Sequence, residues 1–179
     1  EVTQPAMLCA GVASWRIVSQ QLASQQRAIP QATMMAGHSL GEYSALVCAG
    51  SIDLGDAVSL VARRGQLMQS AVKAGEGAMA AIIGLDDDAV REACARVSEG
   101  VVEAVNFNAP GQVVIAGESV AVESAMANAK ELGAKRALPL PVSVPCHCSL
   151  LRDSATQLAA ELETVAIDVP QVAVIHNHG

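Results

Sequence analysis

A serine between two glycines is the first residue of this sequence whose setting points to chemistry. Ser39 lies in Gly37-His38-Ser39-Leu40-Gly41, which matches the pattern G-x-S-x-G. The short apolar stretch 33–37 predicts a strand before it, and residues 40–49 predict a helix after it. This order is typical of a nucleophile elbow, which presents a serine hydroxyl at a helix N-terminus. The Leu40 backbone N–H then points to where an oxyanion forms, and the helix dipole favours that charge.

A serine nucleophile needs a base, because a free hydroxyl is a poor nucleophile near neutral pH. The four histidines are His38, His147, His176 and His178. The side chain of His38 is expected to point away from the tip of the elbow, and His176 and His178 lie at the C-terminal end. We predict that His147, in a loop before a helix, is the base. The alternative is a histidine that caps that helix or is buried and hydrogen-bonded.

Arg64 is the third candidate because of its place on a helix predicted from Asp53 to about Lys73. Arg63, beside it, has polar neighbours and is expected in solvent. A guanidinium on an apolar face is costly unless it meets an anion. Arg64 is therefore expected either in a structural salt bridge or as a bidentate clamp for a substrate carboxylate. The neighbours that place it on the apolar face are Leu60, Val61, Leu67 and Met68.

Composition and charge exclude some classes of protein. About half of the 179 residues are apolar (51%) but only 2% are aromatic, so the core must be aliphatic. The net charge of -7 argues against nucleic acid as the main partner. No apolar run reaches the roughly 18 residues of a membrane span, and the N-terminus lacks the basic region of a signal peptide. We expect a cytoplasmic protein with no membrane partner.

The cysteines predict free thiols in a reducing compartment. An odd number at scattered positions is not a disulfide framework. Two of them flank His147, but successive residues of an extended segment point to opposite faces, so His147 faces away from both, and no second cluster lies nearby. We therefore expect no metal site. The five positions are Cys9, Cys48, Cys94, Cys146 and Cys148.

The elements along the chain predict an α/β protein with an insert. Within 76–138 the pattern indicates β-α-β-β-α-β, the order of a ferredoxin-like unit. The larger α/β domain comprises 1–75 and 139–179, and begins with a helix from Thr3 to about Gln25, before a break at Pro30. In the insert we expect strands at 79–83, 101–106, 112–116 and 135–138, helices from Asp86 to near Gly100 and at 119–132, and a turn at Asn108–Gly111. After it we expect a helix at 149–163 and a strand at 172–175.

At these residues the sequence resembles the bacterial malonyl-CoA:acyl-carrier-protein transacylases of fatty-acid synthesis. The matching stretches fall in family order and cover essentially the whole chain, so together they are far more specific than G-x-S-x-G alone. They are Thr3-Gln4-Pro5-Ala6, Gly37-His38-Ser39-Leu40-Gly41-Glu42-Tyr43-Ser44-Ala45-Leu46, Arg64-Gly65, Gly77-Ala78-Met79-Ala80-Ala81-Ile82, Val105-Asn106-Phe107-Asn108-Ala109-Pro110-Gly111-Gln112-Val113-Val114-Ile115-Ala116-Gly117 and Pro141-Val142-Ser143-Val144-Pro145-Cys146-His147.

The resemblance implies a hydrolase-like parallel-sheet domain with the ferredoxin-like insert. It implies Ser39 as the acylated nucleophile, His147 as general acid and base, the Leu40 N–H as an oxyanion donor and Arg64 as the partner of the malonyl carboxylate. His38 and Asn108 are further predicted substrate-binding residues. The implied partners are malonyl-CoA and acyl carrier protein, and the ping-pong chemistry needs no metal or redox cofactor.

The sequence departs from the family in three places. It lacks the Gly-Gln-Gly-Ser-Gln loop that supplies the second oxyanion donor, and the downstream Gln whose carbonyl orients the histidine. Without the second donor we expect the rate to be about 10²–10³-fold lower. The chain has no initiator Met and stops just after a predicted strand, so we expect a truncated chain with little activity of its own. Cys146 stands where Ser is usual, and we expect no change of function from it.

Two other functions share these features. A thioesterase or carboxylesterase has the same elbow and Ser–His pair, but uses water as acceptor, usually with an Asp or Glu behind the histidine. A non-catalytic module would only dock carrier protein or another synthase domain. A malonyl-enzyme that persists in water and discharges onto a thiol marks a transferase, and absence of an adduct on Ser39 marks the docking module.

Overall fold

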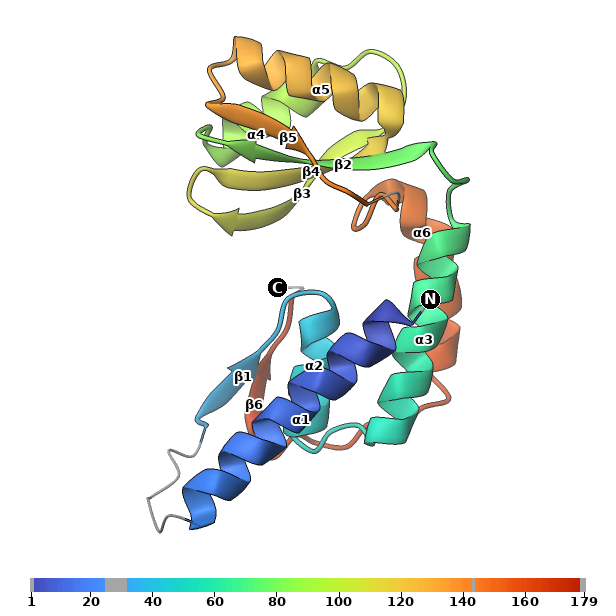
Figure 1. Ribbon diagram of the computed structural model, residues 1–179. Helices are drawn as coiled ribbons and strands as arrows, with labels where there is room; N and C mark the ends of the chain where they lie inside the picture. The colour runs from blue at the N-terminus through green and yellow to red at the C-terminus, as the bar shows by residue number, and fades with distance from the viewer. Residues whose placement is uncertain (1, 25–31, 143, 178–179) are drawn as a thin grey trace. The chain divides into compact units, whose positions relative to one another are not determined.

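The computed structural model of the protein describes residues 2–24, 32–142 and 144–177 (Figure 1). The chain forms two compact units, one made of 1–66 and 158–179 and the other of 67–157. The sequence-based limits 1–75, 76–138 and 139–179 stay a prediction. Gln25, Pro30, Ser143 and His178 lie outside the described residues. Within the described part, no helix is both long and apolar enough to cross a bilayer.

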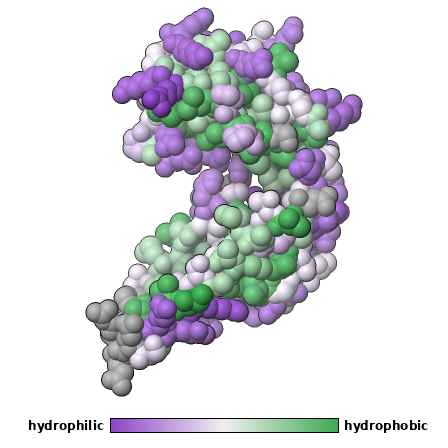
Figure 2. All heavy atoms as spheres, viewed as in Figure 1, coloured by the Kyte–Doolittle hydropathy of each residue, from purple (hydrophilic) through white to green (hydrophobic). Residues whose placement is uncertain are grey.

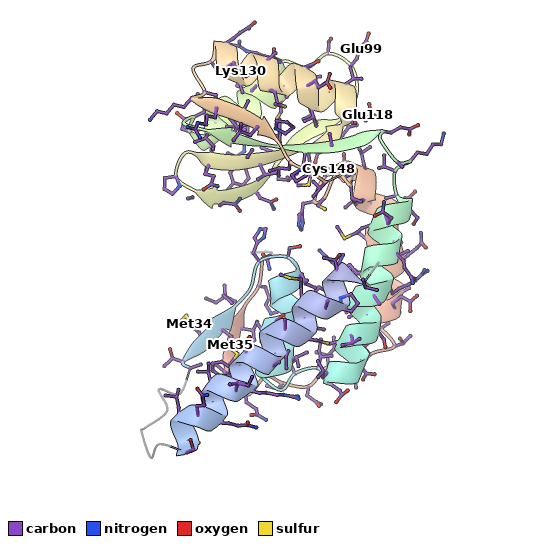
Figure 3. All side chains as sticks on the ribbon, in the orientation of Figure 1. Met34, Met35, Glu99, Glu118, Lys130 and Cys148 are labelled. Carbon is purple, nitrogen blue, oxygen red and sulfur yellow. The ribbon has the colours of Figure 1, made fainter. Side chains whose placement is uncertain are left out.

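The first unit contains the predicted elbow, a two-stranded parallel sheet, two whole helices and parts of two others. Its elements are α1 (Thr3–Ser24), β1 (Met34–Ala36), α2 (Leu40–Cys48), the N-terminal part of α3 (Leu54–Ser70), the end of α6 (Arg152–Leu162) and β6 (Ala173–Ile175). β1 pairs with β6 in the register Met34↔Ala173, and Figure 3 labels Met34 and Met35 on β1. The core of the unit consists of Leu8, Val12, Val47, Ile52, Ala57 and Val61.

Local signals explain where the helices of this unit lie. α3 begins after Asp53, whose Oδ1 accepts the Gly55 N–H at 2.7 Å, as an N-cap residue does. α1 buries only Leu8 and Val12 fully. Apolar side chains are exposed along the rest of it, and Figure 2 shows apolar surface over α1. These exposed residues are Met7, Trp15, Ile17 and Val18.

The second unit is an antiparallel sheet with two helices on one face (Figure 1). Its strand order is β3-β4-β2-β5. α4 and α5 cover the face that carries Ile82, Val113 and Ile115. A smaller cluster around Met79 and Cys148 lies in the same unit. The elements are β2 (Gly77–Ile83), α4 (Asp87–Ala95), β3 (Val102–Ala109), β4 (Gln112–Glu118), α5 (Ser119–Glu131), β5 (Arg136–Pro139), a 3-10 turn (Ser149–Leu151) and the start of α6.

Two predicted boundaries in this unit are wrong. α4 ends at Ala95 instead of near Gly100, because the Val97 N–H bonds to the Cys94 carbonyl three residues back and tightens the last turn. β3 continues to Ala109, so the turn is Pro110-Gly111 and not 108–111. Gly111 has φ 73°, which lets two residues reverse the chain. Asn108 therefore lies in a strand.

Cys94 on α4 is expected to resist alkylation in the folded protein. Burial, and then the Glu103 carboxylate, raise the pKa of its thiol to about 11. Only thiolate reacts, so iodoacetamide at about pH 8 should modify the exposed Cys9 and spare Cys94 until the protein unfolds. Because the pKa of Cys94 is higher in the folded than in the unfolded protein, this thiol contributes its full stabilisation of the fold below the usual thiol pKa of about 8.5. That contribution is lost as the pH rises from there through the folded-state pKa. Peptide mass spectrometry measures both sites, and equal labelling rates would contradict the expectation.

Candidate active site

The turn between β1 and α2 holds Ser39 in a conformation that few residues other than glycine adopt. Ser39 has φ 54° and ψ -111°. Such a conformation costs of order 1–3 kcal/mol and persists only where the surroundings enforce it. α2 starts at the next residue, and the Gly41 N–H donates to the His38 carbonyl at 2.9 Å. The predicted strand–turn–helix is present, with the Leu40 N–H in its first turn.

Close backbone approach explains the first glycine of G-x-S-x-G. A Cβ added to Gly37 would lie 2.0 Å from the carbonyl carbon and oxygen of Gly41. No side chain fits there without moving backbone. A Cβ added to Gly41 would meet nothing within 4 Å among the described residues. The two glycines of the motif therefore have different roles, and only Gly37 is required by packing.

Arg64 reaches the serine from α3. Its Nη2 donates to Ser39 Oγ at 2.8 Å, and its Nη1 donates to Gln4 Oε1 at 2.6 Å. The guanidinium carbon lies 5.8 Å from the centroid of the Tyr43 ring, within cation–π range. Burial raises the pKa of Tyr43, and the Arg64 charge partly opposes that rise. In the part of the chain that the structure describes, Arg64 thus contacts neutral groups and makes no ion pair with a carboxylate.

Arg63, expected in solvent, lies at the surface and forms an ion pair there. Its Nε is 3.1 Å from Glu161 Oε1, and its side chain is 43% exposed. The two adjacent arginines therefore differ in partner, since Arg63 pairs with an acid at the surface and Arg64 contacts the serine hydroxyl. This makes Arg63 a matched control for substitutions of Arg64.

The two residues that follow β6, His176 and Asn177, bond to the elbow and to the first turn of α2. Asn177 Nδ2 donates to the Gly37 carbonyl at 2.8 Å, and Asn177 Oδ1 accepts the Ser39 N–H at 3.3 Å. Glu42 binds the same segment, with 2.6 Å from its Oε1 to His176 Nδ1 and 3.2 Å from its Oε2 to the Asn177 N–H. Burial raises the pKa of Glu42, but the hydrogen bonds of His176 and Asn177 lower it overall, so the carboxylate form is favoured.

His147 lies in the second unit, on an exposed turn between β5 and the 3-10 turn. Its φ is 67°, and within the described residues only Ser39 and His147 combine a side chain with a positive φ. Such residues are uncommon and concentrate at functional sites. The turn is anchored by Cys148 Sγ, which donates to the Pro145 carbonyl at 3.2 Å, and by Glu103, which accepts the Ser149 N–H at 3.2 Å. The pairing of His147 with Ser39 stays a prediction.

The two remaining predicted site residues are both exposed. His38 lies in the elbow, next to Ser39. Asn108 lies on β3 in the second unit and lines an open pocket of ≈ 750 Å³ together with Arg91 and Phe107. The Arg91 guanidinium stacks 4.4 Å from the Phe107 ring centroid in this pocket. Substrate contacts for His38 and Asn108 remain predictions.

Comparison with known families decides the class of this site. The acyl transferase domain family matches residues 1–178. The chain belongs to this family. The elbow and the arginine above are thus parts of an acyl transferase domain.

Curated relatives of this acyl transferase domain are named malonyl CoA-acyl carrier protein transacylases. The Escherichia coli (strain K12) protein is 58% identical over 176 residues, which are 98% of this chain and 55% of that protein. The Bacillus subtilis (strain 168) protein is 50% identical over 144 residues, 79% of this chain and 45% of that protein. The chain spans about half the length of the curated relatives it matches.

Solved structures agree with the α/β architecture of parallel and antiparallel sheets. An acyl carrier protein S-malonyltransferase from Vibrio cholerae superimposes with a TM-score of 0.90 at 58% identity, over 98% of this chain and 56% of that one. A malonyl-transacylase in complex with its type II PKS acyl-carrier protein gives a TM-score of 0.91 at 53% identity, over 98% and 55%.

Sequence reasoning assigned no role to three residues of the acyl transferase domain that contact the site. Glu42 and Gln4 stand within the matched stretches, and Glu42 follows Ser39 by three residues, in the first turn of α2. That position was a usable signal, because an acid there faces the elbow. The sequence around Asn177 gave no such signal, since the residues that it contacts lie up to 140 positions earlier in the chain.

Proposed function

We propose that the whole protein transfers the malonyl group of malonyl-CoA to the phosphopantetheine thiol of acyl carrier protein, and so supplies extender units for fatty-acid synthesis. The observation that carries the proposal is the 2.8 Å hydrogen bond from Arg64 to Ser39 Oγ. In a malonyl-serine, one methylene separates the free carboxylate from the ester carbonyl. A guanidinium that contacts Oγ is therefore within reach of that carboxylate. The names of the relatives support the same acyl donor and acceptor.

The reaction consists of two half-reactions at Ser39. In the first, His147 takes the Oγ proton while Oγ bonds to the thioester carbonyl carbon. The oxyanion is held by the Leu40 N–H at the start of α2. The C–S bond then breaks and His147 returns the proton to the coenzyme A thiolate. In the second, His147 takes the proton of the pantetheine thiol, sulfur attacks the malonyl ester, and the proton returns to Ser39.

The finer fold assignment is part of the same proposal. The order β-α-β-β-α-β and the strand order β3-β4-β2-β5 support a ferredoxin-like subdomain. The parallel β1–β6 pair followed by an elbow supports a hydrolase-like parallel-sheet domain. His38 and Asn108 would contact substrate. The chemistry requires no metal or redox cofactor, and all its partners occur in the cytoplasm.

Replacing Arg64 by alanine tests the proposal. Malonyl transfer should fall by about 10²–10³-fold in kcat/KM, because two charge-assisted hydrogen bonds to the carboxylate are lost. Acetyl has no carboxylate, so its transfer should fall less or rise, since the unpaired cation no longer opposes it. Steady-state kinetics with malonyl-CoA and acetyl-CoA measure the ratio of the two kcat/KM values in the variant and in wild type.

The matched control is Arg63→Ala, which removes only a half-exposed ion pair with Glu161. Such pairs contribute about 0–1 kcal/mol, so both transfers should stay within about two-fold of wild type. Equal losses of malonyl and acetyl transfer in Arg64→Ala would contradict the proposal that Arg64 binds the malonyl carboxylate. A malonyl-enzyme that water discharges as fast as a thiol does would identify an esterase instead.

A further inference from the structure

We infer that Asn177 is a positioning residue for the Ser39 nucleophile and that Glu42 holds it in place. The inference rests on the proposed function, which makes Ser39 the acylated residue. The side chain of Asn177 makes one hydrogen bond on each side of His38. Its Nδ2 donates to the Gly37 carbonyl (2.8 Å), and its Oδ1 accepts from the Ser39 N–H (3.3 Å). A single carboxamide thus ties the end of the strand segment to the start of the helix.

This bridge acts where the backbone is under strain. Ser39 has φ 54°, and that conformation needs surroundings that enforce it. The carboxamide fixes the peptide on each side of His38, which sets the direction of the Ser39 side chain and of the following Leu40 N–H. Because the Ser39 N–H is already donated to Asn177, it is the Leu40 N–H that serves an oxyanion. Loss of the bridge should therefore affect the chemical step more than substrate binding.

Glu42 determines which way the carboxamide faces. Its Oε2 accepts from both the backbone N–H and Nδ2 of Asn177, and its Oε1 contacts His176 Nδ1 at 2.6 Å. An amide has two donor hydrogens and one acceptor oxygen, and here Glu42 and Gly37 take the donors while Ser39 uses the acceptor. A flipped amide would turn its NH₂ toward the Ser39 N–H. An aspartate at 177 would place a carboxylate against Glu42.

Single-turnover acylation by malonyl-CoA in the whole protein tests this role. In Asn177→Ala, the rate constant for acyl-serine formation should fall about 10- to 100-fold, because a small misalignment of a nucleophile has effects of this size. The malonyl-CoA concentration for half-maximal rate should change less than about three-fold, since Arg64 is untouched. The matched control is Asn128→Ala, which also removes a side-chain Nδ2 bond to a carbonyl (Ala93, 3.0 Å) but lies far from the elbow in sequence. It should leave the rate constant unchanged.

A pair of charge changes separates positioning from mere structural support. Asn177→Asp should acylate slowly, because its carboxylate faces both Glu42 and the Gly37 carbonyl oxygen. Adding Glu42→Gln replaces the repulsion between the two carboxylates by an amide–carboxylate pair, while the bond to Gly37 stays lost, and should recover at least about five-fold of the lost rate. A folded Asn177→Ala that acylates within about two-fold of wild type, or a double variant no faster than Asn177→Asp, would overturn the inference.

A fluorophosphonate probe distinguishes this inference from the proposed function. It phosphonylates an aligned serine without needing a malonyl group. If wild type reacts with the probe but forms no malonyl adduct, the proposed substrate is wrong, and slower labelling of Asn177→Ala still supports the positioning role. If Asn177→Ala and wild type label at equal rates, the positioning role is wrong whatever the substrate. If wild-type Ser39 reacts with neither reagent, both fail.

Discussion

Ser39→Ala is expected to abolish the covalent intermediate and to lower malonyl transfer by about 10⁴–10⁶-fold. The methyl group of alanine cannot form the acyl bond, and the remaining oxyanion donor and binding contacts have no nucleophile to assist. Intact-protein mass spectrometry after incubation with malonyl-CoA should show one added malonyl group in wild type and none in the variant. Arg64 also loses the hydroxyl that it contacts at 2.8 Å, so a modest change in stability is expected as well.

Ser44→Ala is the control for that experiment, since Ser44 lies on the same helix, one turn beyond the elbow. It should acylate and transfer like wild type. A malonyl adduct that still forms in Ser39→Ala would show that another residue is acylated and would contradict the assignment of Ser39 as the nucleophile. Loss of the adduct in both variants would point to damage of α2 rather than loss of the nucleophile.

Gly37→Ala is expected to destabilise the first unit by more than about 3 kcal/mol and to abolish acylation. Its Cβ would lie 2.0 Å from the Gly41 carbonyl carbon and oxygen, which are backbone atoms that cannot rotate away. The turn must open, and the Asn177 bond to the Gly37 carbonyl must lengthen with it. Chemical denaturation and malonyl labelling measure the two effects.

Gly41→Ala is the matched substitution at the other glycine of the motif. Its Cβ meets no atom within 4 Å in the described part of the chain, and alanine favours a helix by roughly 0.8–1.0 kcal/mol over glycine. The variant should be as stable as wild type or more so. Equal destabilisation by the two substitutions would show that the close approach at Gly37 is not what shapes the elbow.

Most elements could be predicted from the sequence because their signals are local. The Asp53 cap, the glycines around Ser39 and the apolar runs each act within a few residues, and α1, α2 and β2 begin where or near where those signals place them. The end of α4 could not be predicted in the same way. No proline or glycine stops it at Ala95, and the tightened turn at Val97 decides it.

The two residue types that meet at the candidate site could be predicted, but the contacts that support them could not. The type of residue at Ser39 and the helical spacing of Arg64 were sufficient to predict one hydroxyl and one inward cation, and the structure brings the two into contact. Neither spacing nor composition reveals that an amide at 177 meets a carbonyl at 37. Such contacts depend on the β1–β6 register, which only the folded backbone sets.

The long sequence separation of the Ser39–Asn177 contact has a consequence for the order of events during synthesis. The two residues are 138 positions apart, and the ribosome releases the N-terminal one first. A nascent chain can form the helix that follows Ser39 well before the partner of β1 and the amide that bonds to the turn have been synthesised. The Ser39 turn is therefore expected to reach its final conformation only after residue 177 has been synthesised.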